Sequence, residues 1–409
     1  MTGAAGPRPL RSVIWRGLMR GVSLAIAVAL AAVMVSCTST GPSRATTATP
    51  SAIVGPLRVS GNAIVDANGH PVILRGLARA GLNAKPYVEN DSHLDAANFD
   101  AMKSWGANIV RIYLGQQFWL SNECEYVNYY PRKVDQVVDW ITSRGMVALL
   151  DLNWNTRNSC LKSKGQKMAD TGSITFWHEV ATRYKDNPLV AFDLYNEPHG
   201  ITWSVWRDGG QIVDVDLTWT AAGMQQMYDA VRETGAQNLV FVSGNVWANM
   251  PPPSQYQLTG SNIVYATHWY TCPNDPPPTC TTSDPYNPAP PGKRLNAWLP
   301  LMTTHPVVIT EFGWPDSNDG TYTKNVIDWA ASHHAGWIAY HWGIGNGTRH
   351  LDFGLLRDWT TWAPDPAGQP VKDALALTGD ALSGTSTTTG QTAMSRRVGQ
   401  IWIRKARSS

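Results

Sequence analysis

The sequence predicts an α/β fold, a closed (β/α)8 barrel preceded by a short N-terminal β-hairpin. Short apolar runs alternate with segments of helical period, and this strand-then-helix order implies a parallel sheet. The alternation repeats eight times within roughly 320 residues, a length that fits one closed barrel. A doubly wound open sheet is the alternative. It is disfavoured because no glycine-rich phosphate loop follows the first expected strand.

The hairpin and the strands are expected in the following order. From Leu57 the chain has two short alternating runs with a turn signal at Asn68–Gly69, which predict the hairpin. The eight barrel strands are expected at the apolar runs Val72–Leu74, Ile109–Leu114, Val147–Leu150, Val190–Leu194, Leu239–Val242, Ile263–Ala266, Val307–Ile309 and Trp337–Tyr340.

Three segments between these runs carry clear signals of helix ends. Leu94–Gly106 and Pro131–Gly145 both stop at a glycine, and the second begins with proline, which is favoured in the first helical turn. Thr175–Pro188 has helical period and stops at a proline. We expect these segments to be helices on the outside of the barrel.

Polar and aromatic residues stand where the expected strands end. In a barrel of this class the loops after the carboxyl ends of the strands converge on one mouth, which holds the active site. Ordinary loop tips would more often show Gly, Ser and Lys. The residues at these positions are Arg111, Asn153, Asn196, Glu197, Asn245, His268, Tyr270, Glu311, His341 and Trp342.

Glu197 and Glu311 are the pair that points to a reaction. They end the fourth and seventh expected strands, so a closed barrel brings both to one mouth. Glycoside hydrolysis needs two carboxyl groups, one to protonate the departing oxygen and one to attack or to activate water. A structural ion pair explains one glutamate alone better than it explains two at opposed strand ends. The pair therefore indicates acid/base or nucleophilic work on a polar bond.

Three motifs resemble glycoside hydrolase family 5, the cellulase family A group. They are "NEP" at Asn196–Pro198, "HWY" at His268–Tyr270 and "TEFGW" at Thr310–Trp314. The motifs fall on the fourth, sixth and seventh expected strands, which is the family's order. The resemblance covers the barrel, roughly Leu57–Gly379.

The resemblance implies a role for each matching residue. Glu197 would be the general acid/base and Glu311 the nucleophile. Around them the resemblance implies Asn196 as donor to the sugar 2-hydroxyl, Arg111 as a cation beside the nucleophile, His268 beside the acid/base, Tyr270 as hydrogen-bond donor to the nucleophile, and Trp342 as the floor under the sugar being cleaved.

One position departs from the family's pattern. The third strand of many members ends in a histidine, whereas "LLDLNWN" has Asn153 there. An amide can still hydrogen-bond a hydroxyl, so the departure bears on which sugar is held and not on the reaction. Five tryptophans just beyond strand ends could stack on sugars, namely Trp154, Trp203, Trp206, Trp247 and Trp314.

The sequence favours an exported retaining β-glycosidase that cleaves β-1,4-linked glucan internally. A β-mannanase, a xyloglucan-type enzyme and an exo-acting β-glucosidase stay open, because loop shape decides between them. The long proline-rich loop Thr271–Pro291 could wall an open groove or close one end of it. A non-catalytic glycan-binding lipoprotein is the alternative from another class. It is disfavoured because a decayed site usually loses its carboxylates first.

No metal or other cofactor is expected, and nucleic acid is excluded as a partner. His268 and His341 are the only histidines at strand ends, whereas a metal-dependent barrel would place several ligands there. Without the arginines of the first 20 residues and the five cations after residue 395, the formal net charge of +2 becomes −7. The mildly acidic barrel does not suit nucleic acid. We expect a monomer.

The first residues predict export to the cell surface or the medium. Four arginines precede the apolar run Gly21–Val35. The basic segment and the apolar run together predict a signal peptide over residues 1–36. "MVSC", which ends at Cys37, resembles a lipobox, and the sequence leaves open whether Cys37 carries a lipid. Residues 37–56 read as a Ser/Thr/Pro-rich linker, 57–380 as the catalytic domain and 381–409 as a disordered basic tail.

Four cysteines remain if Cys37 is set apart, and an exported protein can pair them. They allow three pairings. The pairing that joins cysteines near each other in the sequence links Cys272 to Cys280 and Cys124 to Cys160.

Overall fold

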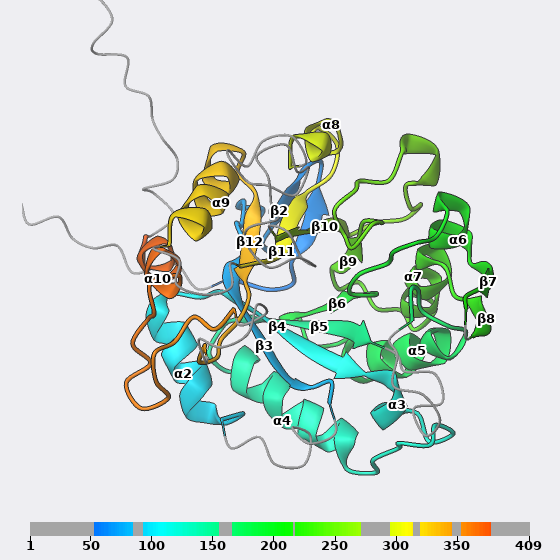
Figure 1. Ribbon diagram of the computed structural model, residues 1–409, viewed down its shortest axis with the longest axis horizontal. Helices are drawn as coiled ribbons and strands as arrows, with labels where there is room; N and C mark the ends of the chain where they lie inside the picture. The colour runs from blue at the N-terminus through cyan, green and yellow to red at the C-terminus, as the bar shows by residue number, and fades with distance from the viewer. Residues whose placement is uncertain are drawn as a thin grey trace, which may run out of the picture. The chain divides into compact units, whose positions relative to one another are not determined.

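The computed structural model describes residues 53–84, 93–154, 166–215, 217–270, 295–313, 320–345 and 353–377, without the side chain of Trp154. The chain divides into Met1–Thr47 and Ala48–Ser409, and every described residue belongs to the second unit. The helices of this unit surround the barrel strands (Figure 1).

Eight parallel strands close into a barrel, which confirms the predicted fold class. Each strand pairs in parallel with its two neighbours, in the order β10-β11-β12-β3-β4-β5-β6-β9. The strands are β3 (Arg75–Leu82), β4 (Ile109–Gly115), β5 (Val147–Trp154), β6 (Val190–Asp193), β9 (Val240–Ser243), β10 (Ile263–Tyr270), β11 (Val307–Gly313) and β12 (Gly336–Ala339).

The first barrel strand lies later in the chain than predicted. We expected it at Val72–Leu74, but β3 begins at Arg75. Val72 instead pairs with the hairpin, since its N–H donates to the Ile64 carbonyl. The strand was missed because two arginines interrupt its apolar pattern, and Arg75 donates to the carbonyls of Ala374 and Leu377 outside the barrel.

The hairpin is present, but its turn is not the one predicted. β1 (Arg58–Ser60) and β2 (Ala63–Val65) pair in antiparallel register around Gly61 and Asn62. The turn at Asn68–Gly69 follows β2 and returns the chain so that Pro71 bridges Val65.

The three predicted helices are present. They are α2 (Ala96–Trp105), α4 (Tyr130–Thr142) and α5 (Gly172–Tyr184), and α2 ends at Gly106 in the left-handed region with φ 103°. The other elements of the described part are α3 (Gln116–Trp119), α6 (Trp203–Asp208), α7 (Met224–Glu233), α8 (Leu299–Met302), α9 (Thr321–Ser332), α10 (Gly368–Ala376), the 3-10 turns Ser254–Tyr256 and Leu295–Trp298, and the antiparallel pair β7 (Gly210–Val213) and β8 (Thr218–Ala221).

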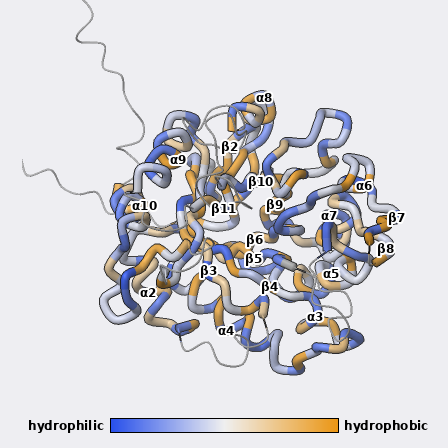
Figure 2. Tube along the Cα trace, viewed as in Figure 1, coloured by the Kyte–Doolittle hydropathy of each residue, from blue (hydrophilic) through white to orange (hydrophobic). Residues whose placement is uncertain are grey.

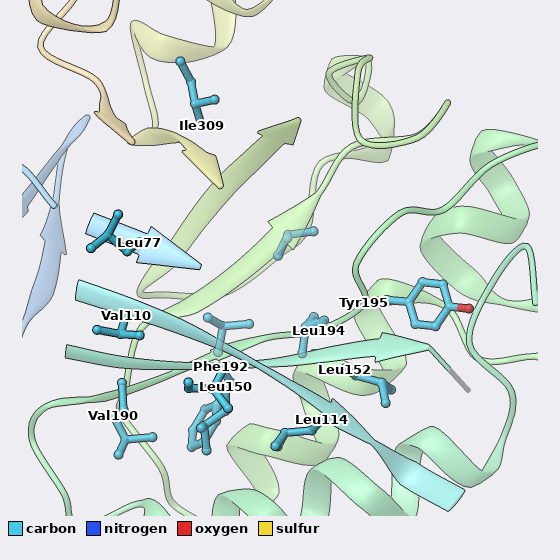
Figure 3. Close-up of a cluster of buried hydrophobic side chains, with 14 of the residues drawn as sticks. Leu77, Val110, Leu114, Leu150, Leu152, Val190, Phe192, Leu194, Tyr195 and Ile309 are labelled. Atoms are coloured by element: carbon cyan, nitrogen blue, oxygen red, sulfur yellow. The ribbon is translucent and has the colours of Figure 1, made fainter. Parts of the chain in front are cut away.

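The strands are buried on both faces, as expected for a sheet covered by helices. One face packs against the helices, where Val110 and Leu114 of β4 gather with Leu150 of β5 and Phe192 of β6 (Figure 3). In Figure 2 the outer helices alternate between hydrophilic and hydrophobic colours along their length. None of the described helices combines the length and apolar character needed to cross a membrane.

The other face of the strands fills the inside of the barrel. Ile109 and Tyr113 belong to this inner cluster together with Leu149 and Ala191. Because side chains alternate along a strand, Arg111 also points inward between Ile109 and Tyr113. The same alternation places polar residues of β5 and β6 inside the barrel, and these build the site.

Candidate active site

Glu311 lies on β11 and accepts hydrogen bonds on both carboxylate oxygens. Its Oε1 accepts from the Arg111 guanidinium and, at 2.8 Å, from the Tyr113 hydroxyl. Its Oε2 accepts from the Tyr270 hydroxyl at 2.7 Å. The side chain is 7% exposed, so these contacts form where little water competes.

The surroundings of Glu311 favour its ionised form. Burial by itself would raise the pKa of this carboxyl. The attraction of His268 and Arg111 outweighs burial, and the hydroxyls of Tyr270 and Tyr113 add to it, so the pKa of Glu311 lies below its usual value. A buried carboxylate held ionised in this way can act as a nucleophile.

Glu197 lies four residues beyond β6, in a segment whose backbone continues the barrel ladder. The N–H of Leu194 donates to Phe241 and that of Asn196 donates to Leu152. The Glu197 side chain is 17% exposed, and its Oε1 lies 2.8 Å from His268 Nδ1. Glu197 is therefore fixed at its base and open to solvent at its carboxyl group.

The two glutamates face each other across His268. An oxygen of Glu197, an oxygen of Glu311 and a ring nitrogen of His268 all lie within 4.8 Å of one another. His268 Nδ1 is 3.7 Å from Glu311 Oε2. Carboxyl groups about 5 Å apart are the spacing of retaining glycosidases, since inverting enzymes keep a wider gap for water.

The same three groups could, by distance alone, hold a metal ion. Both oxygens of Glu311 already accept hydrogen bonds, however, and the Arg111 guanidinium lies against one of them. A cation here would face this buried positive charge at close range. The arrangement therefore suits an acid/base pair better than a metal site.

Arg111 connects the nucleophile side of the site to buried carboxylates that the sequence analysis missed. Its side chain is 0% exposed and lies 2.9 Å from Asp193 and 3.0 Å from Asp151. Its Nη2 also donates to Asn196 Oδ1 at 2.9 Å. These aspartates carry a sequence signal, because both interrupt apolar runs at strand positions facing the barrel interior.

Asn153 lies inside β5 and is 5% exposed. Its Oδ1 accepts from Asn83 Nδ2 at 2.8 Å. Asn83 follows β3 and was also missed. Asn153 is thus positioned by a second amide, which belongs to the segment after β3.

Trp342 does not fit the role that the resemblance implies. Its side chain is 0% exposed, packs edge-on against Trp105 at 4.9 Å, and donates from Nε1 to Asn98. A ring enclosed in this way has no free face for a sugar. The prediction of a floor at Trp342 is therefore wrong.

Tyr340, two residues before Trp342, lies next to the two tyrosines that contact Glu311. It directly follows β12 and is partly exposed, with its ring centroid 6.2 Å from those of Tyr113 and Tyr270, which both donate to Glu311. The sequence analysis took Tyr340 for the end of an apolar strand. The sequence signal that could have marked Tyr340 as a site residue is its position at the carboxyl end of the last barrel strand.

Among the three tryptophans of this group whose side chains are described, Trp247 contacts a neighbour of Glu197. Its ring stacks on His199 with centroids 3.4 Å apart, and His199 Nδ1 lies 2.8 Å from the Glu197 carbonyl. Trp206, by contrast, is fully buried, and Trp203 packs on its edge.

Several predicted residues lie outside the described part of the chain. Trp314 and the side chain of Trp154 are among them, as are Cys37, Cys160, Cys272 and Cys280. Cys124 is described and does not carry a free thiol. The disulfide pairing stays a prediction.

A cavity of ≈ 380 Å³ lies at the opposite end of the barrel from the glutamates. It is lined by Val147 and Val190, which begin β5 and β6, and by Leu57 before the hairpin. Its few polar side chains do not form a catalytic pair. The strand carboxyl ends remain the place where reactive groups converge.

Comparison with known proteins agrees with this geometry. The family model "Cellulase (glycosyl hydrolase family 5)" matches residues 65–346. Endoglucanase E-5 of Thermobifida fusca is 24% identical over 312 residues, 72% of this chain and 57% of that protein. An endoglucanase of Paenibacillus polymyxa is 24% identical over 76% of this chain and 85% of its own length. The chain spans about half the length of most of the first curated relatives it matches.

Solved structures show the same fold. The catalytic domain of Thermobifida fusca endoglucanase Cel5A superposes with a TM-score of 0.58 at 20% identity, covering 79% of this chain and 98% of that one. The β-glucanase SdGluc5_26A of Saccharophagus degradans in complex with cellotetraose gives 0.59 at 18% identity, covering 80% and 94%.

Proposed function

Because the chain belongs to glycosyl hydrolase family 5, we propose that it hydrolyses β-1,4-linked glucan internally, as an endoglucanase, with retention of anomeric configuration. One observation carries the proposal. The carboxyl oxygens of Glu197 and Glu311 lie within 4.8 Å of each other, and Glu311 is held ionised.

In the first step Glu311 attacks the anomeric carbon of the bound sugar. Glu197 gives its proton to the departing glycosidic oxygen as that C–O bond breaks. An ester bond forms between the sugar and Glu311. The donors around Glu311 fix its orientation before the attack, so little rearrangement is needed.

In the second step Glu197, now ionised, removes a proton from water. The water oxygen attacks the anomeric carbon and displaces Glu311 as a carboxylate. Two inversions restore the starting configuration. His268, 2.8 Å from Glu197, orients the carboxyl group that works in both steps.

The choice of glucan rests on the relatives. The two curated relatives described above are named endoglucanases, and one structural neighbour was solved with cellotetraose. A β-mannanase or an exo-β-glucosidase would use the same pair of glutamates. A panel of purified polysaccharides and aryl glycosides, scored for reducing-sugar release with Glu311→Gln as blank, separates these activities. No release from any substrate would favour a glycan-binding protein instead.

Stereochemistry tests the mechanism. Glu311→Ala with azide should give the α-glycosyl azide, because azide can attack only from the vacated side. Glu197→Ala should form the covalent intermediate from an activated aryl glycoside, and azide should then release the β-azide. If the two variants give the opposite anomers, the roles of the glutamates are reversed.

We further propose that the protein is exported and acts as a monomer at the cell surface or in the medium, with Cys37 as the candidate lipid carrier. Support comes from the basic and apolar segments before Cys37. Mass spectrometry of the mature protein should find its N-terminus at or just after Cys37. An intact Met1 in the mature protein would overturn the proposal of export.

A further inference from the structure

Arg111 is shared by three carboxylates in a buried cluster. Its Nε donates to Asp193 Oδ2 at 2.9 Å, its Nη2 lies 3.0 Å from Asp151 Oδ1, and its Nη1 contacts Glu311 Oε1. The side chains of Arg111 and both aspartates are 0% exposed. Water can therefore reach this cluster only at Glu311, whose side chain is 7% exposed.

The two aspartates are neighbours but make different contacts. They are paired in register on β5 and β6 and share the inner face of the barrel. Asp193 accepts an aligned hydrogen bond from the guanidinium. Asp151 lies close to Arg111 and to the Asn153 amide. Within the described residues, however, no well-aligned hydrogen bond reaches either of its oxygens, and Asp193 Oδ1 has none either.

The cluster holds more negative than positive groups. Burial keeps the pKa of Tyr113 and Tyr195 well above the usual value, so both phenols are neutral. Against the three carboxylates stands the Arg111 guanidinium, and His268 lies between Glu311 and Glu197. The titratable groups around the aspartates are Arg111, Tyr113, Tyr195, His268 and Glu311. Uncompensated buried charge is costly, so one carboxyl should carry a proton.

We propose that Asp151 carries this proton while Asp193 stays ionised and positions Arg111 against the nucleophile. The proposal rests on the proposed function for the role of Glu311, but not for the location of the proton. Asp193 keeps a hydrogen-bonded charge on the guanidinium. A proton on Asp151 neutralises the aspartate that has no well-aligned hydrogen bond on either oxygen.

The electrostatics of the site point the same way. Burial raises the pKa of Asp151 well above its usual value, and Asp193 and Glu311 add to the rise despite Arg111 and the Asn153 amide. Burial also raises the pKa of Asp193, and Arg111 and His268 oppose it. Of the two, Asp151 is the better carrier of the proton.

This division of charge matters when the covalent intermediate forms. Glu311 then becomes a neutral ester, and Arg111 loses one of its counter-charges. An ionised Asp193 still pairs with the guanidinium, so no buried cation is left alone. Without Asp193, the pair between Arg111 and ionised Glu311 would stabilise the free enzyme more than the transition state.

Two matched variants test the proposal by kinetics. Asp193→Asn keeps a hydrogen-bond acceptor but removes the charge. It should lower kcat about 10- to 100-fold with little change in KM, the range usual for a partner that orients an active group. The acid limb of its profile of kcat/KM against pH should move to lower pH. With one fewer carboxylate competing for Arg111, the pKa of Glu311 should fall. Asp151→Asn replaces a neutral acid by a neutral amide, so its acid limb should stay at the wild-type pH.

Infrared spectroscopy tests the proton without any substrate. In a Glu197→Gln background, the carbonyl stretch of a protonated carboxylic acid should persist at neutral pH. It should disappear when Asp151→Asn is added. This measurement remains decisive if Asp193→Asn fails to fold or if the enzyme cleaves another glycan.

Three results would overturn the proposal. The first is that no such carbonyl signal exists at neutral pH, or that it survives Asp151→Asn. The second is that Asp151→Asn moves the acid limb as far as Asp193→Asn does. The third is an upward shift of the acid limb in Asp193→Asn, which would mean that Asp193 acts through packing and not through its charge.

Discussion

At Glu311, the attraction of His268 and Arg111, together with two tyrosine hydroxyls, holds a carboxylate ionised against the effect of burial. Tyr270 reaches Oε2, whereas Tyr113 and Arg111 reach Oε1. Each donor bonds the charged form more strongly than the neutral one. The pH at which activity appears should therefore depend on each donor.

Tyr270→Phe removes the hydroxyl that donates to Glu311 and keeps the ring. The pKa of Glu311 should rise, because one interaction that favours its ionised form is lost. Activity needs ionised Glu311 and falls as the pH drops through this pKa, so the acid limb of the profile of kcat/KM should move to higher pH. Tyr322→Phe, whose hydroxyl bonds the Trp269 carbonyl, is the control. An unmoved acid limb in Tyr270→Phe would show that this contact does not set the charge of Glu311.

Asn153 stands where many family members have histidine. Asn153→Ala should lower kcat/KM about 10- to 100-fold, as expected for the loss of one hydrogen bond of about 1 to 3 kcal/mol, without changing stereochemistry. Asn83→Ala serves as a comparison, because it removes the group that holds Asn153 in place. Wild-type kinetics of Asn153→Ala on every active substrate would leave Asn153 without a role in binding.

At the scale of an element, the loop after β9 adopts a rare backbone conformation. Val246, Trp247 and Ala248 have φ values of 57°, 59° and 58°, in the left-handed region that residues with a Cβ seldom occupy. This loop holds Trp247 on His199, whose Nδ1 lies 2.8 Å from the backbone carbonyl of Glu197. The backbone strain is thus located at the candidate active site.

Val246→Asn should stabilise the protein by about 0.5 to 1 kcal/mol, because asparagine tolerates the left-handed region better than a β-branched residue does. Val246 is 38% exposed, so little packing is lost. Denaturant midpoints measure the effect. Val213→Asn, on the exposed edge pair β7–β8, makes the same exchange without positive φ and should give no gain. Equal shifts in both variants would argue against strain at Val246.

At the scale of the whole molecule, barrel closure depends on close approach between strands. Gly76 on β3 pairs with Ile109 on β4, and a Cβ at Gly76 would lie 1.8 Å from the Ile109 carbonyl oxygen. Rotation of a side chain cannot relieve this clash, because the nearest atom belongs to the backbone of Ile109. The register between β3 and β4 thus requires glycine.

Gly76→Ala should destabilise the barrel by more than about 3 kcal/mol, since the two strands must separate. Gly145→Ala is the matched control. Gly145 has φ 66° but no atom within 4 Å of an added Cβ, so it should cost only about 1 kcal/mol. Thermal or denaturant unfolding measures both. Similar losses would mean that the β3–β4 contact can relax.

The sequence by itself determined the barrel, seven of its eight strands in outline, and the placement of Glu197 and Glu311 at one mouth. Apolar runs report burial residue by residue, and strand-then-helix order fixes a parallel closed sheet. Given that fold, any polar residue at a strand's carboxyl end is brought to the mouth. Strand lengths were underestimated, because β5, β10 and β11 continue through polar residues that the barrel interior accommodates.

Only the tertiary structure decided which neighbours each of these residues has. Both faces of a barrel strand are buried, so the sequence does not show that Arg111 and Asp193 face inward while Val110 faces the helices. In the same way, Trp342 and Tyr340 are two aromatic residues near the end of one strand. Packing of Trp342 against Trp105 encloses one ring, while Tyr340 lies next to Tyr270, which donates to Glu311. Contacts between residues far apart in the chain are set by the register and packing of several strands at once, and no local pattern records them.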